Sequence, residues 1–341
     1  MGRESFAERL WGVLAKHTII IVLVGLIIVF AVACPQVFLS GENIQNVARQ
    51  ISFDVIAAFG ELVCLIAAGV DLSVGSTLAM AAALTMGLQG YGVGVAVGAA
   101  LAMGLVVGAF NGLLVTKGRI VPFIATLGSM EIVYGAMLTY TGQRPIPGRS
   151  EWFASIGNGS VGPVPLPTVI MLVLLGTFHV LLNYTRFGRN MYAAGGNPEA
   201  ARLAGVQVDR YRFWAFVLSG FCAALSGVLL ASRLNSATIH MGLQTPLFVI
   251  AACIMGGASM LSGRGTAVGA ALGVLALTIL SNGMDLLGIF TYYQMAIRAI
   301  ILIFVVAVDA FYVSTVHKRL ATASAIGAKR AERRSIPRQQ C

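Results

Sequence analysis

The sequence has very few charged residues, and this shortage excludes most soluble folds. Only 11% of its 341 residues are Asp, Glu, Lys or Arg, whereas 57% are hydrophobic. A soluble domain has roughly a quarter of its residues charged, because water must solvate its surface. A chain with so few charges has lipid as its main solvent. Its 40 glycines suit helices that pack closely in that solvent.

Motifs for catalysis and metal binding are also missing. No G-x-x-x-x-G-K-[ST] phosphate loop, H-E-x-x-H pair or nucleophile elbow occurs in the sequence. The five cysteines show no C-x-x-C spacing and the four histidines are scattered, so neither a disulfide framework nor a metal site is indicated. We therefore expect no catalytic residue, metal or cofactor, which leaves a transporter, a channel or a membrane scaffold.

Ten apolar stretches have the length of membrane-spanning helices, which need about 20 residues. Backbone groups in lipid must be paired internally, and the alternating pattern of barrel strands is not seen. We therefore expect an all-α integral membrane protein with a single transmembrane domain over residues 1–341. The predicted spans are 18–38, 51–69, 75–90, 92–115, 121–140, 167–184, 211–232, 246–261, 266–288 and 293–312.

The distribution of Lys and Arg predicts the orientation of these spans. If the N-terminus is cytoplasmic, 18 of these residues lie on the cytoplasmic side and four on the other side. Cytoplasmic loops carry such an excess, so we expect both termini, the loop 185–210 and the basic tail 313–341 in the cytoplasm. The net charge of +10 then reflects orientation and attraction to anionic membrane lipid, and we expect no nucleic-acid partner.

The loop 185–210 contains a short helix with recognisable ends. Asn197 is a favoured N-cap, Pro198 suits the first helical position, and Gly205 suits the left-handed position after the last turn. Glu199 lies at the positive end of the helix dipole. Two turns of helix are not stable alone, so a surface must hold them. That surface is either the base of the protein and its lipid, or a cytoplasmic partner.

The spans also suggest an inverted repeat. The stretches 51–140 and 211–312 each contain four spans and are separated by an odd number of spans, so they run in opposite senses. The second helix of each half is short and follows a helix-start signal. Short spans at matching positions indicate a translocation pathway, although they are equally explained as caps at loop ends. The resulting pathway candidates are Asp71, Ser73, Asn111, Thr245 and Asn282.

Two acidic residues, Glu61 and Glu131, fall near the middle of apolar spans. An acid at that depth costs about 2.5 kcal/mol or more on insertion scales. We expect both to be neutral hydrogen-bond donors that either bind a polar solute or tie helices together. Both are therefore further candidates for the pathway.

Four motifs in sequence order resemble the permease subunits of bacterial ABC importers for ribose and related sugars. They are Val70–Ser76, Pro122–Gly128, Gly195–Gly205 and Gly256–Thr266, and the similarity extends over about residues 45–312. In that family the third motif is the coupling helix that contacts the ATPase. The resemblance thus implies a coupling role for Gly195, Gly196, Asn197, Glu199, Ala200, Ala201, Arg202 and Gly205.

The resemblance implies a multi-pass protein of the bacterial inner membrane that imports a monosaccharide or sugar alcohol. Its partners would be an ATPase subunit with two nucleotide-binding domains, a periplasmic sugar-binding protein and a second permease copy, identical or paralogous. The sequence departs from the family pattern at Glu61 and Glu131, where neutral residues are usual, and at Ala68–Val70. A proton-coupled transporter using those acids, or an ABC permease for a branched-chain amino acid or furanone-like signal, remains the alternative.

Overall fold

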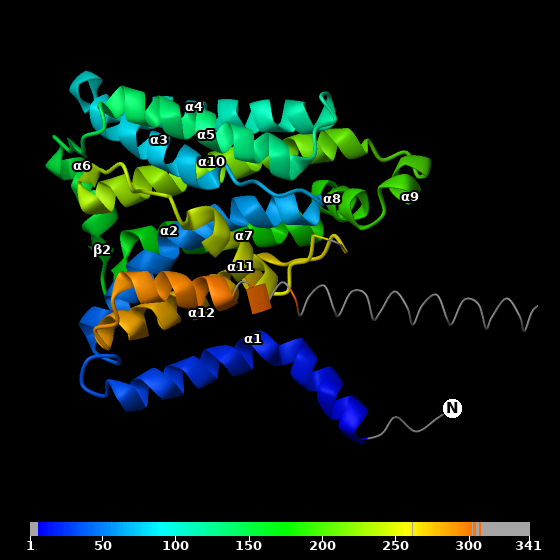
Figure 1. The fold of residues 1–341 in the computed structure, drawn as a ribbon, viewed down its shortest axis with the longest axis horizontal. Helices are drawn as coiled ribbons and strands as arrows, with labels where there is room; N and C mark the ends of the chain where they lie inside the picture. The colour runs from blue at the N-terminus through cyan, green and yellow to red at the C-terminus, as the bar shows by residue number, and fades with distance from the viewer. Residues whose placement is uncertain (1–5, 261, 302, 305–306, 308–341) are drawn as a thin grey trace, which may run out of the picture.

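The computed structural model describes residues 6–260, 262–301, 303–304 and 307. Most of these residues are helical, and the long helices run along one common direction (Figure 1). The helices are α1 (Phe6–Ala33), α2 (Gly41–Ile66), α3 (Val74–Gly87), η1 (Gln89–Tyr91), α4 (Val93–Thr116), α5 (Pro122–Thr141), α6 (Glu151–Asn158), α7 (Leu166–Tyr184), α8 (Arg186–Gly196), α9 (Pro198–Leu203), α10 (Val208–Leu234), α11 (Thr245–Met255), α12 (Ala267–Leu286) and a final helix that includes residues 291–301.

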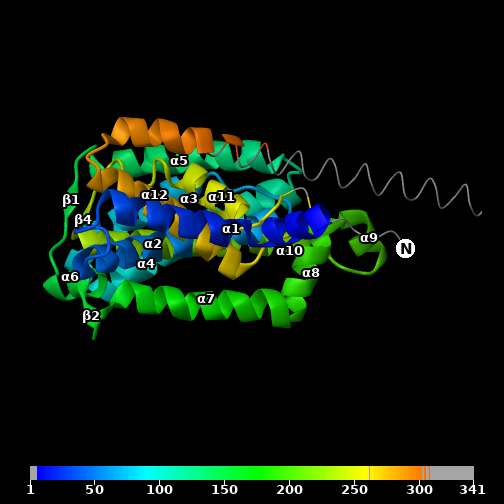
Figure 2. The same cartoon turned by 90° about the horizontal axis from the view of Figure 1, so that it is seen from below.

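Short elements close the bundle at its two ends. Strand β1 (Ile146–Pro147) pairs antiparallel with β4 (Ser236–Ala237), and β2 (Ser160–Val161) pairs with β3 (Val164–Pro165). The label of α6 lies with those of the strands at one end, whereas α8, α9 and the start of α1 lie at the other end (Figures 1 and 2). The loops predicted to face opposite sides of the membrane are therefore at opposite ends, while the side that each end faces stays a prediction.

Helix α10 forms the centre of the bundle and packs against α2, α3 and α4. Of the residues in the most apolar stretch of α10, 67% are buried inside the protein. The corresponding share is 22% in each of α5 and α7, which lie at opposite edges of the bundle in Figure 2. Glycines set the contact of α10 with α4, because a Cβ added at Gly104 would lie 2.5 Å from the Gly220 carbonyl oxygen. Such close backbone contact is the packing expected in lipid, where apolar burial does not drive helices together.

The predicted spans are compared with the helices as follows. Five helices, α4, α5, α7, α10 and α12, are long and apolar enough to cross a membrane, which agrees with an all-α membrane protein. Helices α1 and α2 extend beyond the first two predicted spans, since α1 begins at Phe6 and α2 at Gly41, and the number and bounds of the membrane spans stay predictions. Ser40 fixes the early start of α2, because its hydroxyl accepts a hydrogen bond from the Asn43 N–H. The end of span 293–312 and the tail 313–341 lie outside the described residues, and the inverted repeat stays a prediction.

Candidate functional site: a helical loop and two polar regions

The loop between α7 and α10 consists of the two helices α8 and α9, which meet at Asn197. The Asn197 side chain accepts a hydrogen bond from the Ala200 N–H at 3.0 Å, and Pro198 occupies the first turn of α9. Gly205 has a φ of +82°, in the left-handed region. The short helix and the caps predicted from the sequence are therefore present.

The end of α8 is pressed against the rest of the protein. A Cβ added at Gly195 would lie 1.7 Å from the Ile66 carbonyl oxygen, at the end of α2. A Cβ at Gly263, where φ is +57°, would lie 2.5 Å from the Gly196 nitrogen. The Tyr192 hydroxyl donates to the Gly265 carbonyl at 2.6 Å. Gly195 and Gly196 thus connect the loop to α2 and to the segment 256–266, and any contact of theirs with an ATPase stays a prediction.

Helix α9 has a buried side and an exposed side. Ala201 is 5% exposed and clusters with Ala194 and Val208, so it holds α9 against its own loop. Leu203 is 91% exposed, an apolar side chain at the tip of the loop. Leu203 was not among the predicted functional residues. A large apolar side chain on a short, otherwise polar helix could have pointed to it. The exposed side chains of α9 are Glu199, Ala200, Arg202 and Leu203.

Four pathway candidates meet in one sealed cluster between α2, α3 and α4: Glu61, Asp71, Ser73 and Asn111. Each is at most 1% exposed. The Asp71 carboxylate accepts from the Ser73 hydroxyl at 2.6 Å and from the Ser73 N–H at 2.9 Å. The Asn111 amide donates to the Ser73 hydroxyl at 2.8 Å, and the Glu61 carboxylate accepts from the Asp71 N–H at 3.3 Å. We call this set the sealed cluster; its role on a pathway stays a prediction.

The short helices α3 and α11 begin against each other. A Cβ added at Gly75 would lie 2.1 Å from the Gly242 carbonyl, just before α11. The predicted helix-start signals lie at the starts of both helices, since Ser73 is the N-cap residue of α3 and Pro246 lies in the first turn of α11. The Ser73 hydroxyl makes no cap bond because it donates to Asp71, and Gln244 is the N-cap residue of α11. With 14 and 11 residues these helices span only about 21 and 17 Å, less than the hydrocarbon core.

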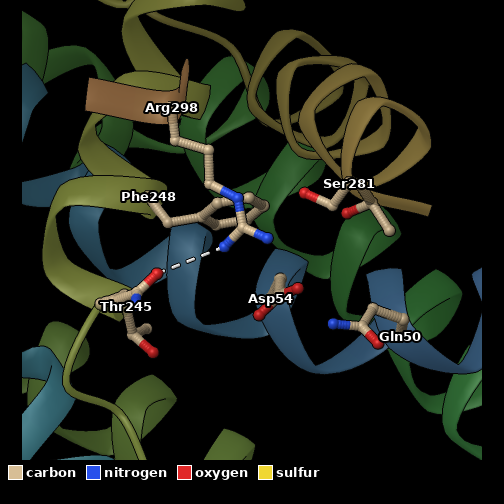
Figure 3. Close-up of a pocket in the computed structure, with 8 residues that line it drawn as sticks. Gln50, Asp54, Thr245, Phe248, Ser281 and Arg298 are labelled. Carbon is tan, nitrogen blue, oxygen red and sulfur yellow. Dashed lines mark hydrogen bonds between the residues drawn. The ribbon is translucent and has the colours of Figure 1, made fainter. Parts of the chain in front are cut away.

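The other three candidates lie elsewhere. Thr245 faces a polar cavity between α2, α11, α12 and the final helix (Figure 3). Asn282 lines an adjoining cavity and exchanges two amide hydrogen bonds with Asn43, of 2.9 and 2.8 Å, which tie α12 to the start of α2. The expectation that Glu131 acts as a buried donor is wrong, because this side chain is exposed on α5 and no hydrogen bond joins it to a described residue.

The sequence analysis also missed two charged residues of the cavity. Asp54 falls within the predicted span 51–69 and Arg298 within 293–312, so each was visible as a charge inside an apolar run. The structure brings them to the same cavity from helices more than 200 residues apart in the chain. A charge inside a span is a functional signal by default, and for Arg298 the sequence offered no evident partner on its own helix.

A helical bundle with apolar spans, discontinuous short helices and polar groups between them defines a multi-pass membrane transport protein. The pattern of the family described as "branched-chain amino acid transport system / permease component" matches residues 43–306. The chain belongs to this permease family. It is therefore a multi-pass inner-membrane protein.

Full-length relatives agree with this assignment. The chain is 37% identical to the ribose import permease protein RbsC of Escherichia coli K12 over 90% of this chain and 97% of the relative. It is 38% identical to RbsC of Bacillus subtilis 168, over 87% and 94%. It is 36% identical to the galactose/methyl galactoside import permease protein MglC of E. coli K12, over 80% and 87%. No solved structure matches.

Proposed function

We propose that this chain is the membrane-spanning subunit of an ATP-binding-cassette importer that carries a monosaccharide or a sugar alcohol into the cell. The observation that carries this proposal is a capped helix, α9, that exposes Leu203 at the tip of a loop. An exposed Leu beside charged groups is a surface made for a protein partner. The likeness over nearly the whole length to permeases named for ribose and galactose supports a sugar as the cargo.

The proposed partners are based on the likeness to import permeases. An ATPase with two nucleotide-binding domains supplies the energy, and a periplasmic binding protein delivers the solute. A second permease copy, identical or paralogous, pairs with this chain in the membrane lipid. Each nucleotide-binding domain of the ATPase then binds the α9 helix of one permease copy. When the two domains close, they move both loops at once as rigid bodies.

The contacts of the loop suggest how movement reaches the membrane. Displacement of α9 moves α8, and Gly195 transmits this to the end of α2 because their backbones touch. Gly263 and the Tyr192–Gly265 hydrogen bond transmit it to the segment 256–266, which follows α11. Helices α2 and α11 both line the polar cavity. The loop thus has direct mechanical access to the helices around the solute.

A branched-chain amino acid is the second candidate cargo, because the family description names it. The discriminating experiment reconstitutes the transporter with its ATPase and binding protein. The binding protein is loaded with pentoses, hexoses, polyols or leucine, and ATP hydrolysis is measured. We expect stimulation by one or more sugars and none by leucine. Stimulation by leucine alone would overturn the choice of cargo.

The docking role of α9 is tested by Leu203→Asp, which places a charge on the exposed tip. We expect this variant to insert and fold normally but to lose copurification of the ATPase and at least about 90% of uptake, because a charge at the centre of an apolar contact costs several kcal/mol. Tyr91→Asp is the matched control, since Tyr91 is 78% exposed in η1 outside the loop. Full ATPase binding by Leu203→Asp would contradict the proposal.

The sidedness is tested in a background that lacks Cys34 and Cys341. Ser155 and Glu199 are exposed residues of the two opposite ends. Ser155→Cys should react with an impermeant maleimide on intact spheroplasts, whereas Glu199→Cys should react only after the cells are opened. The reverse pattern would place the α9 loop outside and exclude an ATPase partner for it.

A further inference from the structure

The polar cavity in Figure 3 is built by four helical segments that are distant in sequence. It has a volume of about 110 Å³ and is lined from α2, from the start of α11, from α12 and from the final helix. A second cavity of about 100 Å³ adjoins it and shares Gln50, Thr278, Ser281 and Arg298. Pockets for drug-sized ligands are about 300–1,000 Å³, so this space suits a small solute or a few waters.

Asp54 and Arg298 both face the cavity without a direct bond to each other. The guanidinium groups of Arg298 and Arg233 act electrostatically on the Asp54 carboxyl group. Among the described residues, neither forms a hydrogen bond or ion pair with it. Ionisable side chains are costly to bury at membrane depth, and residues of this kind mark functional sites.

Among the described residues, Arg298 is held in place by side-chain amides and forms no ion pair with an acid. Its guanidinium donates to the side-chain oxygens of Gln244 at 3.4 Å and Gln294 at 3.1 Å, while its buried Nε has no partner among the described residues. Gln244 is the N-cap of α11 but makes no cap bond there. The guanidinium is therefore oriented towards the cavity with its charge available, as Figure 3 shows.

Hydroxyl groups complete the lining. Thr278 is only 3% exposed, and its hydroxyl has no hydrogen-bond partner in the described part of the chain. The Ser281 hydroxyl donates to the Leu277 carbonyl one turn back, so its oxygen is still free to accept. A buried hydroxyl without a partner costs free energy unless a ligand or water pairs with it. The orphaned Thr278 hydroxyl thus indicates an occupant.

The chemistry of this lining selects a neutral polyhydroxylated solute. A carboxylate accepts hydrogen bonds from hydroxyl groups, and a guanidinium donates two N–H groups to neighbouring oxygens. Phe248, which also lines the cavity, offers an apolar ring for the C–H face of a sugar. A purely apolar solute would leave the polar groups of this lining unpaired.

We propose that this cavity is a solute-binding subsite of the permease itself, in which Asp54, Arg298 and Thr278 bind vicinal hydroxyl groups of the transported monosaccharide. The inference rests on the proposed function and deepens it, because it gives the membrane subunit a share in selecting the cargo. Helices α2 and α11 both line the site. The α9 loop contacts the end of α2 and the segment that follows α11. ATP-driven movement of the loop would therefore reshape the subsite directly.

The test uses the reconstituted transporter carrying Ser281→Cys, in the background without Cys34 and Cys341. Modification of this cysteine by a small methanethiosulfonate reagent is timed with ribose, galactose, leucine or no addition at millimolar concentration. We expect one of the sugars to slow the reaction at least about threefold and leucine to have no effect. Protection by leucine alone would overturn the proposal, as would equal rates in all four samples.

Binding variants complete the test. In the Ser281→Cys transporter, Asp54→Asn and Arg298→Gln should each raise the sugar concentration that gives half-maximal protection at least about tenfold, because hydrogen bonds to charged groups are the strong ones. The conservative Thr278→Val should raise this concentration less, and Thr139→Val on α5 should leave it unchanged. Unaltered protection in Asp54→Asn and Arg298→Gln overturns the subsite. If sugar-loaded binding protein still stimulates ATP hydrolysis in the wild type, the proposed function survives that failure; if it does not, the function itself is wrong.

Discussion

Two polar regions lie inside the same apolar bundle, and they differ in whether a cavity adjoins them. In the sealed cluster, Asp71 is fully buried, and its Oδ1 accepts hydrogen bonds from the Ser73 N–H and hydroxyl, while its Oδ2 has no partner among the described residues. In the open region, Asp54 faces a cavity and forms no hydrogen bond with a described residue. An acid inside an apolar span therefore has two meanings. Asp71 holds a chain segment in place, whereas Asp54 faces a cavity in which a ligand can bind.

The location of the two regions supports this division. The sealed cluster fixes the extended segment that leads into α3, whereas the open region lies at the start of α11. The two short helices touch at Gly75 and Gly242, so one region supports the other across that contact.

The largest expected effect comes from breaking the sealed cluster. Asp71→Leu leaves the Ser73 N–H and hydroxyl without their acceptor, at about 1–3 kcal/mol for each buried group. At about 2–4 °C per kcal/mol, the midpoint of thermal inactivation in detergent should fall by several degrees. Fluorescence-detected size exclusion after heating measures this. Asp54→Leu should leave the midpoint nearly unchanged while uptake is lost; equal destabilisation by both would erase the distinction.

A smaller effect is expected from the contact that joins the loop to α2. Gly195→Ala places a methyl group against the Ile66 carbonyl, and overpacking of this kind costs about 1–3 kcal/mol. Because the strain lies between α8 and α2, we expect ATP hydrolysis to continue while uptake per ATP falls severalfold. Gly176→Ala on α7 is the control, since nothing lies within 4 Å of its added Cβ. Normal coupling in Gly195→Ala would remove Gly195 from the transmission.

Sequence reasoning succeeded where the signal is local. The ends of α9 follow from Asn197, Pro198 and Gly205, because a cap is made by residues within one turn of each other. Apolar runs likewise located the helices, although α2 begins ten residues before its predicted span because the chain remains helical beyond the apolar part. An apolar run in the sequence indicates the part of a helix that lies in the hydrocarbon core. It does not indicate the full length of that helix.

The same reasoning failed where meaning depends on distant contacts. Nothing near Glu131 in the sequence indicates that its face of α5 is exposed, and nothing near Glu61 indicates that it is sealed. Asp54 and Arg298 meet only because α2 and the final helix pack around α11 and α12. Which polar residues form a site is decided by tertiary packing, and a single sequence carries that information only weakly.

The smallest expected effects sharpen the comparison at Glu61, and they separate ATP-driven from proton-coupled transport. The Glu61 carboxyl group accepts a hydrogen bond from the Asp71 N–H, and its role as a neutral donor stays a prediction. Gln keeps an acceptor oxygen at similar volume and removes only the titratable proton, so Glu61→Gln should retain most uptake. Glu61→Leu removes the acceptor and should do more harm, since a hydrogen bond between membrane helices contributes about 0.6 kcal/mol on average and up to about 1.7. Glu131→Gln, on the exposed face of α5, should change uptake least of all.

Uptake is measured in proteoliposomes with ATP enclosed, with and without an uncoupler. A proton-coupled transporter predicts the opposite pattern, in which Glu61→Gln or Glu131→Gln is inactive and the uncoupler stops uptake despite ATP. That result would replace the ABC mechanism and would turn the sealed cluster from a structural element into a proton site.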